Sequence, residues 1–293
     1  MTTHAGADKP DDEGKEAGSS DDEQDLAPDL SQADRETVEK RKSPPARIVH
    51  EVIRQQGIEE LDRPAASLVW SGVAAGVTIW LSLIAQAALM LKLPDTPWKP
   101  VIAALGYSVG FIVTILGRLQ LFTETTIVAV LPLATHLSWP NLGRTLRLWA
   151  LVFGANMLGT LAVAILIPHV NLVTPELLGA MIDVSSHLKE LTPGDAFARG
   201  IPAGFVLATI AWLLPNTRGQ EVWVVTLLTY IIALASFSHV IAGSAEAWLL
   251  MMTGHATFAF AAFGFILPAL VGNIVGGTGL FAVLAHAQVR SEL

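Results

Sequence analysis

The sequence contains no cysteine, and beyond its first 63 residues it contains very little charge. The absence of cysteine excludes disulfides, thiolate metal ligands and cysteine nucleophiles. Residues 64–293 hold nine basic and nine acidic side chains, which is about one charge in thirteen residues, whereas a soluble domain carries roughly one in four. This composition argues against a soluble enzyme.

Motifs for two common kinds of site are also missing. The chain has no His-Glu-x-x-His zinc motif and no Gly-x-x-x-x-Gly-Lys-Ser/Thr phosphate loop. The histidines at 136, 169, 187 and 255 fall at the ends of apolar runs or between them, with no spacing that suggests a haem pair. We therefore expect no enzyme activity, no cofactor and no nucleic-acid partner.

The charge that is present lies mostly in residues 1–63, whose nine basic and 17 acidic side chains give the whole net charge of −8. Residues 1–43 are rich in Asp, Glu, Ser and Gly and hold almost no large apolar side chains. Such a segment cannot bury enough surface to offset its ordering entropy. We interpret it as a disordered acidic tail, either simply solvated or binding a regulatory partner, and not as a signal peptide.

Residues 44–63 have a different pattern. Apolar side chains recur there at helical spacing, with charged side chains between them: Ile48, Val49, Val52, Ile53, Ile58 and Leu61. This pattern predicts an amphipathic helix that lies at a membrane surface or against a neighbouring subunit.

From residue 64 to residue 293, long apolar runs alternate with short polar connections, which predicts one membrane domain. A hydrocarbon core of about 30 Å needs about 20 helical residues. Two of the six runs are too long for one crossing, and each is interrupted, at 117–120 and at 236–239. The runs are 65–91, 101–134, 146–167, 196–214, 221–253 and 256–287. The sequence predicts an all-α membrane protein with six transmembrane helices, the second and fifth broken.

Basic residues near the span ends predict the orientation. With both termini on one side, that side receives ten Lys and Arg residues and the opposite side receives four. Basic residues are enriched on the cytoplasmic side. We expect both termini in the cytoplasm and the protein in the bacterial inner membrane, in contact with lipid.

Three short patterns occur twice in the same order, about half the membrane portion apart. Residues 72–76 match 200–204, residues 121–124 match 236–239, and residues 155–159 match 272–276, at spacings of 128, 115 and 117. Each half holds three crossings, so the second half must be inverted relative to the first. Inverted repeats with corresponding breaks indicate a solute site near the midplane. The alternative is two packing kinks without a conduit.

Ionisable side chains inside the spans need a function or a partner. His239 lies in the second break and could exchange a proton with a weak acid or donate a hydrogen bond to an anion; the alternative is a neutral histidine that satisfies backbone carbonyls. Arg118, Glu124 and Glu246 also lie within the runs. Arg118 and Glu124 flank the first break, and we expect them to form a structural ion pair; the alternative is a substrate site.

Other residues of the breaks allow two interpretations. Phe122 and Phe237 are either apolar gates or simple packing residues. The hydroxyls of Thr123 and Ser238 either donate to a permeant anion or cap the half-helices that follow.

The motifs around the breaks resemble the formate/nitrite transporter family. They are Gly117-Arg118-Leu-Gln-Leu121-Phe122-Thr123, the Phe-Gly-Ala-Asn156 stretch, Ser-Phe-Ser238-His239-Val-Ile-Ala and Gly-Asn273-Ile-Val-Gly-Gly. The resemblance covers residues 45–290 and implies an aquaporin-like fold with helices two and five broken, assembled as a homopentamer with one pore per protomer. It also implies that Leu121, Phe122 and Thr123 face His239 between two apolar constrictions, with Ile232 at the outer one.

The sequence departs from better-known members at four positions, where a different residue stands in place of an acidic or amide side chain: Gln120, Gly204, Ser238 and Gly243. With its acidic tail, it resembles a divergent branch of the family. The resemblance implies a channel or transporter for small weak-acid anions such as formate or nitrite, with proton transfer at His239. The alternatives are an aquaporin-like pore for neutral solutes and a membrane scaffold with a vestigial pore.

Overall fold

The computed structural model describes residues 31–42 and 44–290, and these residues are helical apart from turns and connections. The chain divides into two compact units, residues 1–43 and 44–293. We describe each unit by itself.

Part of the acidic segment is helical. Residues 1–30 and 43, for which we also predicted disorder, lie outside the described residues. Within the rest, α1 (Gln32–Arg41) is a helix that begins after Ser31. The hydroxyl of Ser31 accepts a hydrogen bond from the amide of Asp34 at 3.2 Å, which caps the first turn. Composition alone did not reveal this local start signal.

The predicted amphipathic helix is present as α2 (Ala46–Asp62). Its buried stripe includes Val49, Ile53 and Leu61, and it packs against α7 (Phe122–Thr135) of the same chain. Gly57 permits close approach, because a Cβ atom there would lie 2.1 Å from the carbonyl oxygen of Val128. The apolar stripe therefore covers a neighbouring helix of its own chain.

Five helical runs in the described residues are long and apolar enough to cross a membrane. Several are divided by short changes of helix type, as in the last run, which includes η4 (Phe260–Ile266), α13 (Leu267–Ile274), η5 (Val275–Ala282) and α14 (Val283–Val289). The other four runs consist of α3 (Ala65–Thr78) with α4 (Trp80–Lys92); α5 (Lys99–Ala103) with η1 (Ala104–Tyr107) and α6 (Ser108–Leu116); α8 (Trp139–His169); and α10 (Pro193–Leu213) with η3 (Leu214–Asn216).

The two predicted interruptions are present. The first separates α6 from α7, at residues 117–121. The second separates α11 (Glu221–Leu234) from α12 (Val240–Met252), at residues 235–239. Since α7, α11 and α12 have only 13 or 14 residues, each is too short to cross the hydrocarbon core alone.

The structure adds a helix that the sequence did not predict. Between α8 and α10 lie α9 (Pro175–Ser185) and η2 (Ser186–Glu190). Thr174 caps α9 by accepting a hydrogen bond from the amide of Leu177, and Pro175 occupies the first turn. α9 packs against α4 and against α12, the helix that follows the second interruption.

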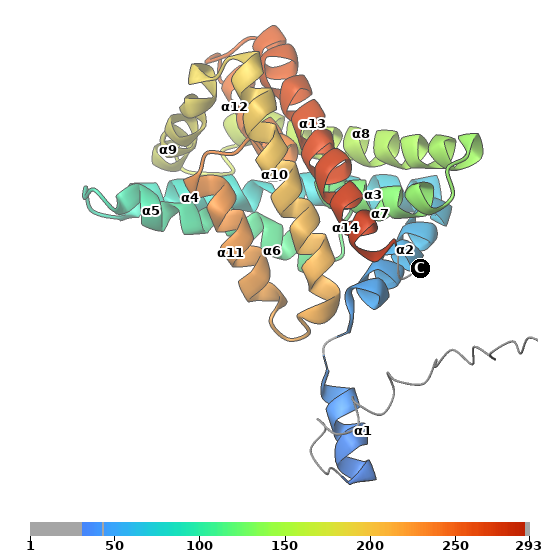
Figure 1. Ribbon diagram of the computed structural model, residues 1–293. Helices are drawn as coiled ribbons and strands as arrows, with labels where there is room; N and C mark the ends of the chain where they lie inside the picture. Colours follow the sequence, from blue (N-terminus) through green and yellow to red (C-terminus); the bar gives the residue numbers. More distant parts are fainter. Residues whose placement is uncertain (1–30, 43, 291–293) are drawn as a thin grey trace, which may run out of the picture. The chain divides into compact units, whose positions relative to one another are not determined.

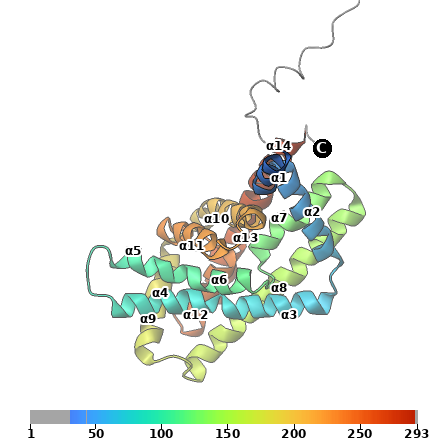
Figure 2. The same ribbon diagram turned by 90° about the horizontal axis from the view of Figure 1, so that it is seen from below.

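Two helix pairs pack closely through glycine: α3 lies beside α8, and α10 lies beside α13 (Figures 1 and 2). At Gly76 a Cβ atom would lie 2.4 Å from the carbonyl oxygen of Asn156, and at Gly204 it would lie 2.1 Å from that of Asn273. Because backbone meets backbone in both pairs, the side chains of α8 and α13 reach the two interruptions.

Candidate substrate pathway

Asn156 on α8 holds the first interruption. Its buried amide nitrogen donates to the carbonyl oxygens of Gly72 and Gln120, both at 2.8 Å. Its side-chain oxygen accepts from the backbone amide of Phe122 at 2.9 Å. The bonds to Gln120 and Phe122 satisfy backbone groups that the broken helix leaves without intrahelical partners, which membrane lipid could not do. The bond to Gly72 joins the break to α3.

Asn273 on α13 holds the second interruption in the same way. It donates to the carbonyl oxygens of Gly200 and Ser238, at 2.9 and 2.8 Å, and accepts from the amide of Val240 at 2.9 Å. At the second interruption the bonded backbone groups belong to Ser238 and Val240, so His239 lies between them. At the first interruption they belong to Gln120 and Phe122, so Leu121 lies between them.

The contacts correct the predicted register of the breaks. The pairs Gly72 with Gly200 and Asn156 with Asn273 keep the predicted spacings of 128 and 117. The break residues correspond at a spacing of 118 instead of 115, so Leu121 matches His239. The phenylalanine and hydroxyl residues of the breaks, Phe122 with Phe237 and Thr123 with Ser238, had favoured the wrong alignment. The hydrogen bonds, and not the residue types, define the equivalence.

His239 lies at the start of α12 and is 1% exposed. Its Nδ1 accepts a hydrogen bond from the amide of Ala242 at 3.1 Å, so the neutral ring carries its hydrogen on Nε2. Nε2 lies 2.7 Å from Oγ1 of Thr123 and donates to it. The hydroxyl hydrogen of Thr123 is therefore free to point at a third group.

This geometry corrects one alternative for the two hydroxyl residues. Thr123 and Ser238 do not cap the half-helices, because the helices begin at Phe122 and Val240. The residue before α12 is His239, and its ring supplies the cap. Oγ of Ser238 has no hydrogen-bond partner among the described residues, and Ser238 lines a cavity.

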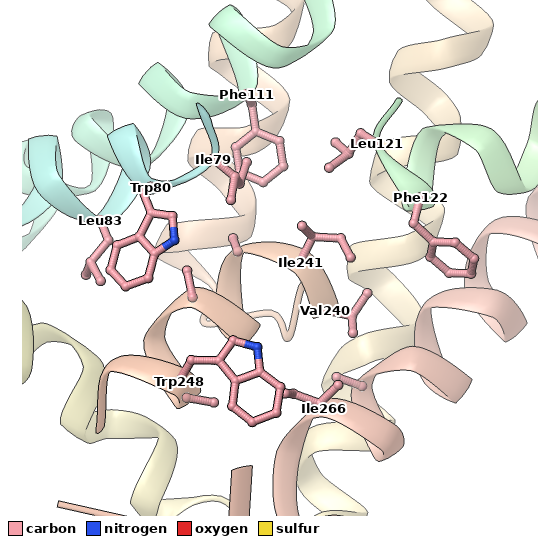
Figure 3. Close-up of a cluster of buried hydrophobic side chains, with 14 of the residues drawn as sticks. Ile79, Trp80, Leu83, Phe111, Leu121, Phe122, Val240, Ile241, Trp248 and Ile266 are labelled. Carbon is pink, nitrogen blue, oxygen red and sulfur yellow. The ribbon is translucent and has the colours of Figure 1, made fainter. Parts of the chain in front are cut away.

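Apolar side chains surround the His239–Thr123 pair. The ring of Phe111 meets that of His239 edge-on, with centroids 4.9 Å apart. In Figure 3, Phe111 and Leu121 point toward one another, whereas Phe122 points away. Phe122 packs edge-on against Phe153 and Trp149 of α8, with centroids 5.2 and 6.1 Å away, which favours the packing interpretation.

Phe111 and Tyr107 were missed in the sequence. They lie one helical turn apart in the run that leads to the first break, with ring centroids 5.1 Å apart. An aromatic pair four residues apart before a predicted break was the available signal.

Separate cavities adjoin the two interruptions. One, the His187 cavity, has a volume of about 340 Å³, and its lining includes Ile232, Phe237, Ser238, His239 and Glu246 as well as His187. The other, the Arg118 cavity, has a volume of about 210 Å³, and its lining includes Glu59, Glu60, Leu121 and Glu124 as well as Arg118. His239 and Leu121, which occupy equivalent positions, thus line different cavities.

The expected ion pair between Arg118 and Glu124 is absent from the described residues. Both side chains line the Arg118 cavity, but no ion pair joins them. Arg118 lies two residues after Leu116, the end of α6, and has a left-handed backbone with φ of 54°, which lets the chain turn at the break. Beside them, Gln120 donates to Glu60 at 2.9 Å and ties the break to α2.

Residues 106–110, Gly-Tyr-Ser-Val-Gly, match the Gly-x-Ser-x-Gly pattern of hydrolase nucleophiles. The structure places them within η1 and α6, and not in a turn between a strand and a helix. Ser108 donates to the carbonyl oxygen of Thr226 at 3.1 Å. A Cβ atom on Gly106 would lie 2.4 Å from the backbone nitrogen of Gln86. The two glycines serve helix packing.

The fold and the site define a multi-pass helical membrane protein in which two interrupted spans meet at a buried histidine. The sequence profile of the formate/nitrite transporter family matches residues 47–287. The chain belongs to this family, which consists of channels and transporters and not of enzymes, as the motifs at the breaks had indicated.

Individual relatives support the assignment to this family. Inner membrane protein YfdC of Escherichia coli (strain K12) is 37% identical over 248 residues, which cover 85% of this chain and 80% of YfdC. Uncharacterized transporter YwcJ of Bacillus subtilis (strain 168) is 24% identical over 62% of this chain and 73% of its own length.

Two solved structures share the fold. One is described as a pentameric formate channel with formate bound, with a TM-score of 0.64 and 21% identity over 78% of this chain and 98% of the channel. The other, described as an FNT family ion channel, has a TM-score of 0.69 and 17% identity over 83% of this chain and 98% of its own.

Two of the four positions at which the sequence departs from better-known family members are glycines, and both have packing roles. Gly204 contacts the backbone of Asn273, so a longer side chain would separate α10 from α13. At Gly243 a Cβ atom would lie 2.4 Å from the ring of Phe265, which lines the His187 cavity. An aromatic ring thus occupies the space beside His239 that a polar side chain at position 243 would need.

Proposed function

We propose that the protein is an inner-membrane channel or transporter for small monovalent weak-acid anions, such as formate or nitrite. The observation that carries this proposal is the hydrogen-bonded pair of His239 and Thr123, buried among apolar side chains. His239 lines one cavity, and Leu121, two residues before Thr123, lines another. Family membership and the shared fold support it.

An anion would enter this constriction at a cost of many kcal/mol, because it would lose its hydration among apolar groups. The neutral acid avoids most of that cost. Nε2 of His239 donates to the oxygen of Thr123, so the threonine hydroxyl can donate to an oxygen of the permeant molecule. The pair therefore provides a hydrogen-bonding site inside the constriction, while the apolar side chains of Ile232, Phe111 and Leu121 exclude water.

Proton transfer at His239 has a structural condition. The neutral ring holds one hydrogen, on Nε2, and giving it away would leave an imidazolate. An imidazolium would need a hydrogen on Nδ1, which already accepts from the amide of Ala242. Proton coupling through His239 therefore requires the cap of α12 to open.

We also propose the finer architecture: six spans as two inverted three-helix repeats, both termini in the cytoplasm, and residues 1–43 as a cytoplasmic tail. The equivalent hydrogen bonds of Asn156 and Asn273 support the repeat. A homopentamer is proposed because a structural relative is described as pentameric and because large apolar side chains are exposed, as a lipid or subunit interface requires: Trp70, Leu137, Trp139, Trp223, Leu227 and Phe263.

A pore for neutral solutes is the second candidate. The His187 cavity has no Lys or Arg among its lining residues, and it contains the carboxyl group of Glu246. An ionised carboxylate there would repel an anion, whereas a neutral solute would pass it.

The test is transport into liposomes that contain the purified protein. Stopped-flow uptake of formate, nitrite, acetate and lactate is compared with glycerol and urea, at two pH values and against protein-free liposomes. Uptake of weak acids above the control supports the main proposal, and pH-insensitive uptake of only neutral solutes selects the second. A His239→Phe variant that assembles normally but keeps the wild-type pH dependence would place proton exchange at another group.

A further inference from the structure

Glu246 and His187 form a second ionisable pair in the His187 cavity. Glu246 lies on α12, seven residues or about two turns beyond His239, and both line this cavity. Its side chain is 9% exposed, and its Oε2 lies 3.7 Å from Nδ1 of His187. Oε2 has no hydrogen-bond partner among the described residues, so a buried carboxyl oxygen is left to exchange a proton.

His187 connects this carboxyl group with solvent. Its Nδ1 donates to the carbonyl oxygen of Val184 at 2.8 Å, because a carbonyl oxygen only accepts. A second proton must therefore enter and leave at Nε2. The side chain is 47% exposed, so the imidazole reaches from the surrounding water to the carboxyl group of Glu246.

Few other ionisable groups face the pair. Tyr107 and His239 line the same cavity, and α4 and η4 contribute Gln86 and Phe265 to it. The remaining ionisable residues of the elements packed against α12 do not line the cavity: Lys92, Glu124, Arg144, Arg147, His169, Glu176, Asp183, Lys189 and Glu190. The ionisable groups that line this cavity are thus Glu246, His187, Tyr107 and His239.

We propose that Glu246 and His187 form the proton-exchange pair that converts the permeant anion into its neutral acid at the outer mouth. The proposal rests on the proposed function. With one shared proton the pair is neutral, so it does not repel an approaching anion. The anion takes that proton and becomes the neutral acid, which leaves the pair with a charge of −1. Nε2 of His187 then takes a proton from the outer solution, and the acid moves on to Thr123.

The proposal accounts for two features together. It supplies the proton that the capped ring of His239 cannot give without breaking its bond to Ala242. It also explains why a carboxyl group lies in an anion pathway: the group acts as an acid while the pair holds its proton. After the proton has been transferred, the negative charge of the pair repels a second anion until the pair has bound another proton.

The test uses the full-length protein in liposomes at a fixed inner pH. Initial formate uptake is measured at an outer pH of about 7.5 and about 5. Glu246→Gln keeps the shape of the side chain but removes its exchangeable proton. We expect its uptake to fall about tenfold or more at the higher outer pH, and to stay within about threefold of wild type at the lower pH, where formic acid itself supplies more neutral solute.

The controls separate this role from folding. Glu190→Gln removes an exposed carboxyl group on η2 that does not line the cavity, and its uptake should equal that of wild type at both pH values. His187→Gln, at a half-exposed site, should lose uptake at the higher pH as Glu246→Gln does, and it replaces Glu246→Gln if that variant fails gel filtration.

Two results would be decisive against the inference. Assembled Glu246→Gln and His187→Gln proteins with wild-type uptake at both outer pH values would overturn the pair and leave the proposed function intact. Wild-type protein with no formate uptake above protein-free liposomes would overturn the proposed function itself.

Discussion

Asn156 and Asn273, 117 residues apart, hold the two interruptions with the same set of hydrogen bonds: two donated to backbone carbonyls and one accepted from a backbone amide. Both side chains are at most 1% exposed. Each therefore satisfies two backbone groups of a break and joins that break to a neighbouring helix.

Removing one of these side chains should destabilise the protein strongly. Asn273→Ala leaves the carbonyl of Ser238 and the amide of Val240 without this partner, and it removes the bond that joins the break to Gly200 in α10. A buried unsatisfied group costs about 1–3 kcal/mol. We expect a large fall in the thermal midpoint of the detergent-solubilised protein, while the exposed Asn216→Ala control keeps it. An unchanged midpoint for Asn273→Ala would contradict this role.

The hydroxyl of Thr123 should matter more than its volume. Thr123→Val keeps the shape but leaves Nε2–H of His239 without its acceptor at 2.7 Å and removes the donor offered to the solute. We expect weak-acid uptake to fall about tenfold or more, and Thr123→Ser to recover most of it. Equal uptake by the valine and serine variants would show that the solute does not use this hydroxyl.

Docking of α2 should depend on the absence of a side chain at position 57. In Gly57→Ala the new methyl group would lie 2.1 Å from the carbonyl oxygen of Val128, a contact that backbone cannot relieve without separating α2 from α7. Such overpacking costs about 1–3 kcal/mol. Limited proteolysis between residues 44 and 63 should become faster, whereas Gly143→Ala, which meets open space, should behave as wild type.

The same helix should loosen as the pH falls. His50 on α2 is 0% exposed, and its Nε2 lies 3.3 Å from Nδ1 of His286. Burial, followed by the nearby His286, lowers the pKa of His50 below its ordinary value of 6.5. The unfolded chain then binds a proton that the folded chain does not, so this stability is complete above pH 6.5 and is lost below it.

Proteolysis of residues 44–63 at about pH 5.5 and about pH 7.5 measures this effect. We expect faster cleavage at the lower pH in wild type and a smaller difference in His50→Phe, which packs against Trp212 without titrating. If both proteins show the same dependence on pH, His50 is not the responsible group.

The sequence predicted the breaks well, because hydropathy and glycine, proline and polar residues are local signals. The runs stop where lipid could not satisfy the backbone, at 117–121 and 235–239. The family motifs also led to His239 and both asparagines. The register of the breaks could not be predicted, since Leu121 and His239 are equivalent only through the hydrogen bonds of distant helices.

Other features depend on contacts between residues far apart in the sequence. Glu246 lies within a predicted span, but its neighbour His187 lies on a short helix between two long apolar runs. The pair Arg118 and Glu124, close in sequence, forms no bond. Proximity along the chain was therefore a poor guide at the first break.

The two buried asparagines supply the framework of the breaks, which leaves selectivity to other side chains. The asparagines fix the broken backbone through α8 and α13, so the side chains of Leu121 and Ser238 are not needed to hold the breaks. Positions such as Leu121, Ser238 and Gly243 are thereby open to substitution during divergence, provided that the neighbouring rings adjust. A single inherited scaffold can in this way give rise to pores with different cargoes, and directed evolution of a new specificity should begin at these positions while sparing both asparagines.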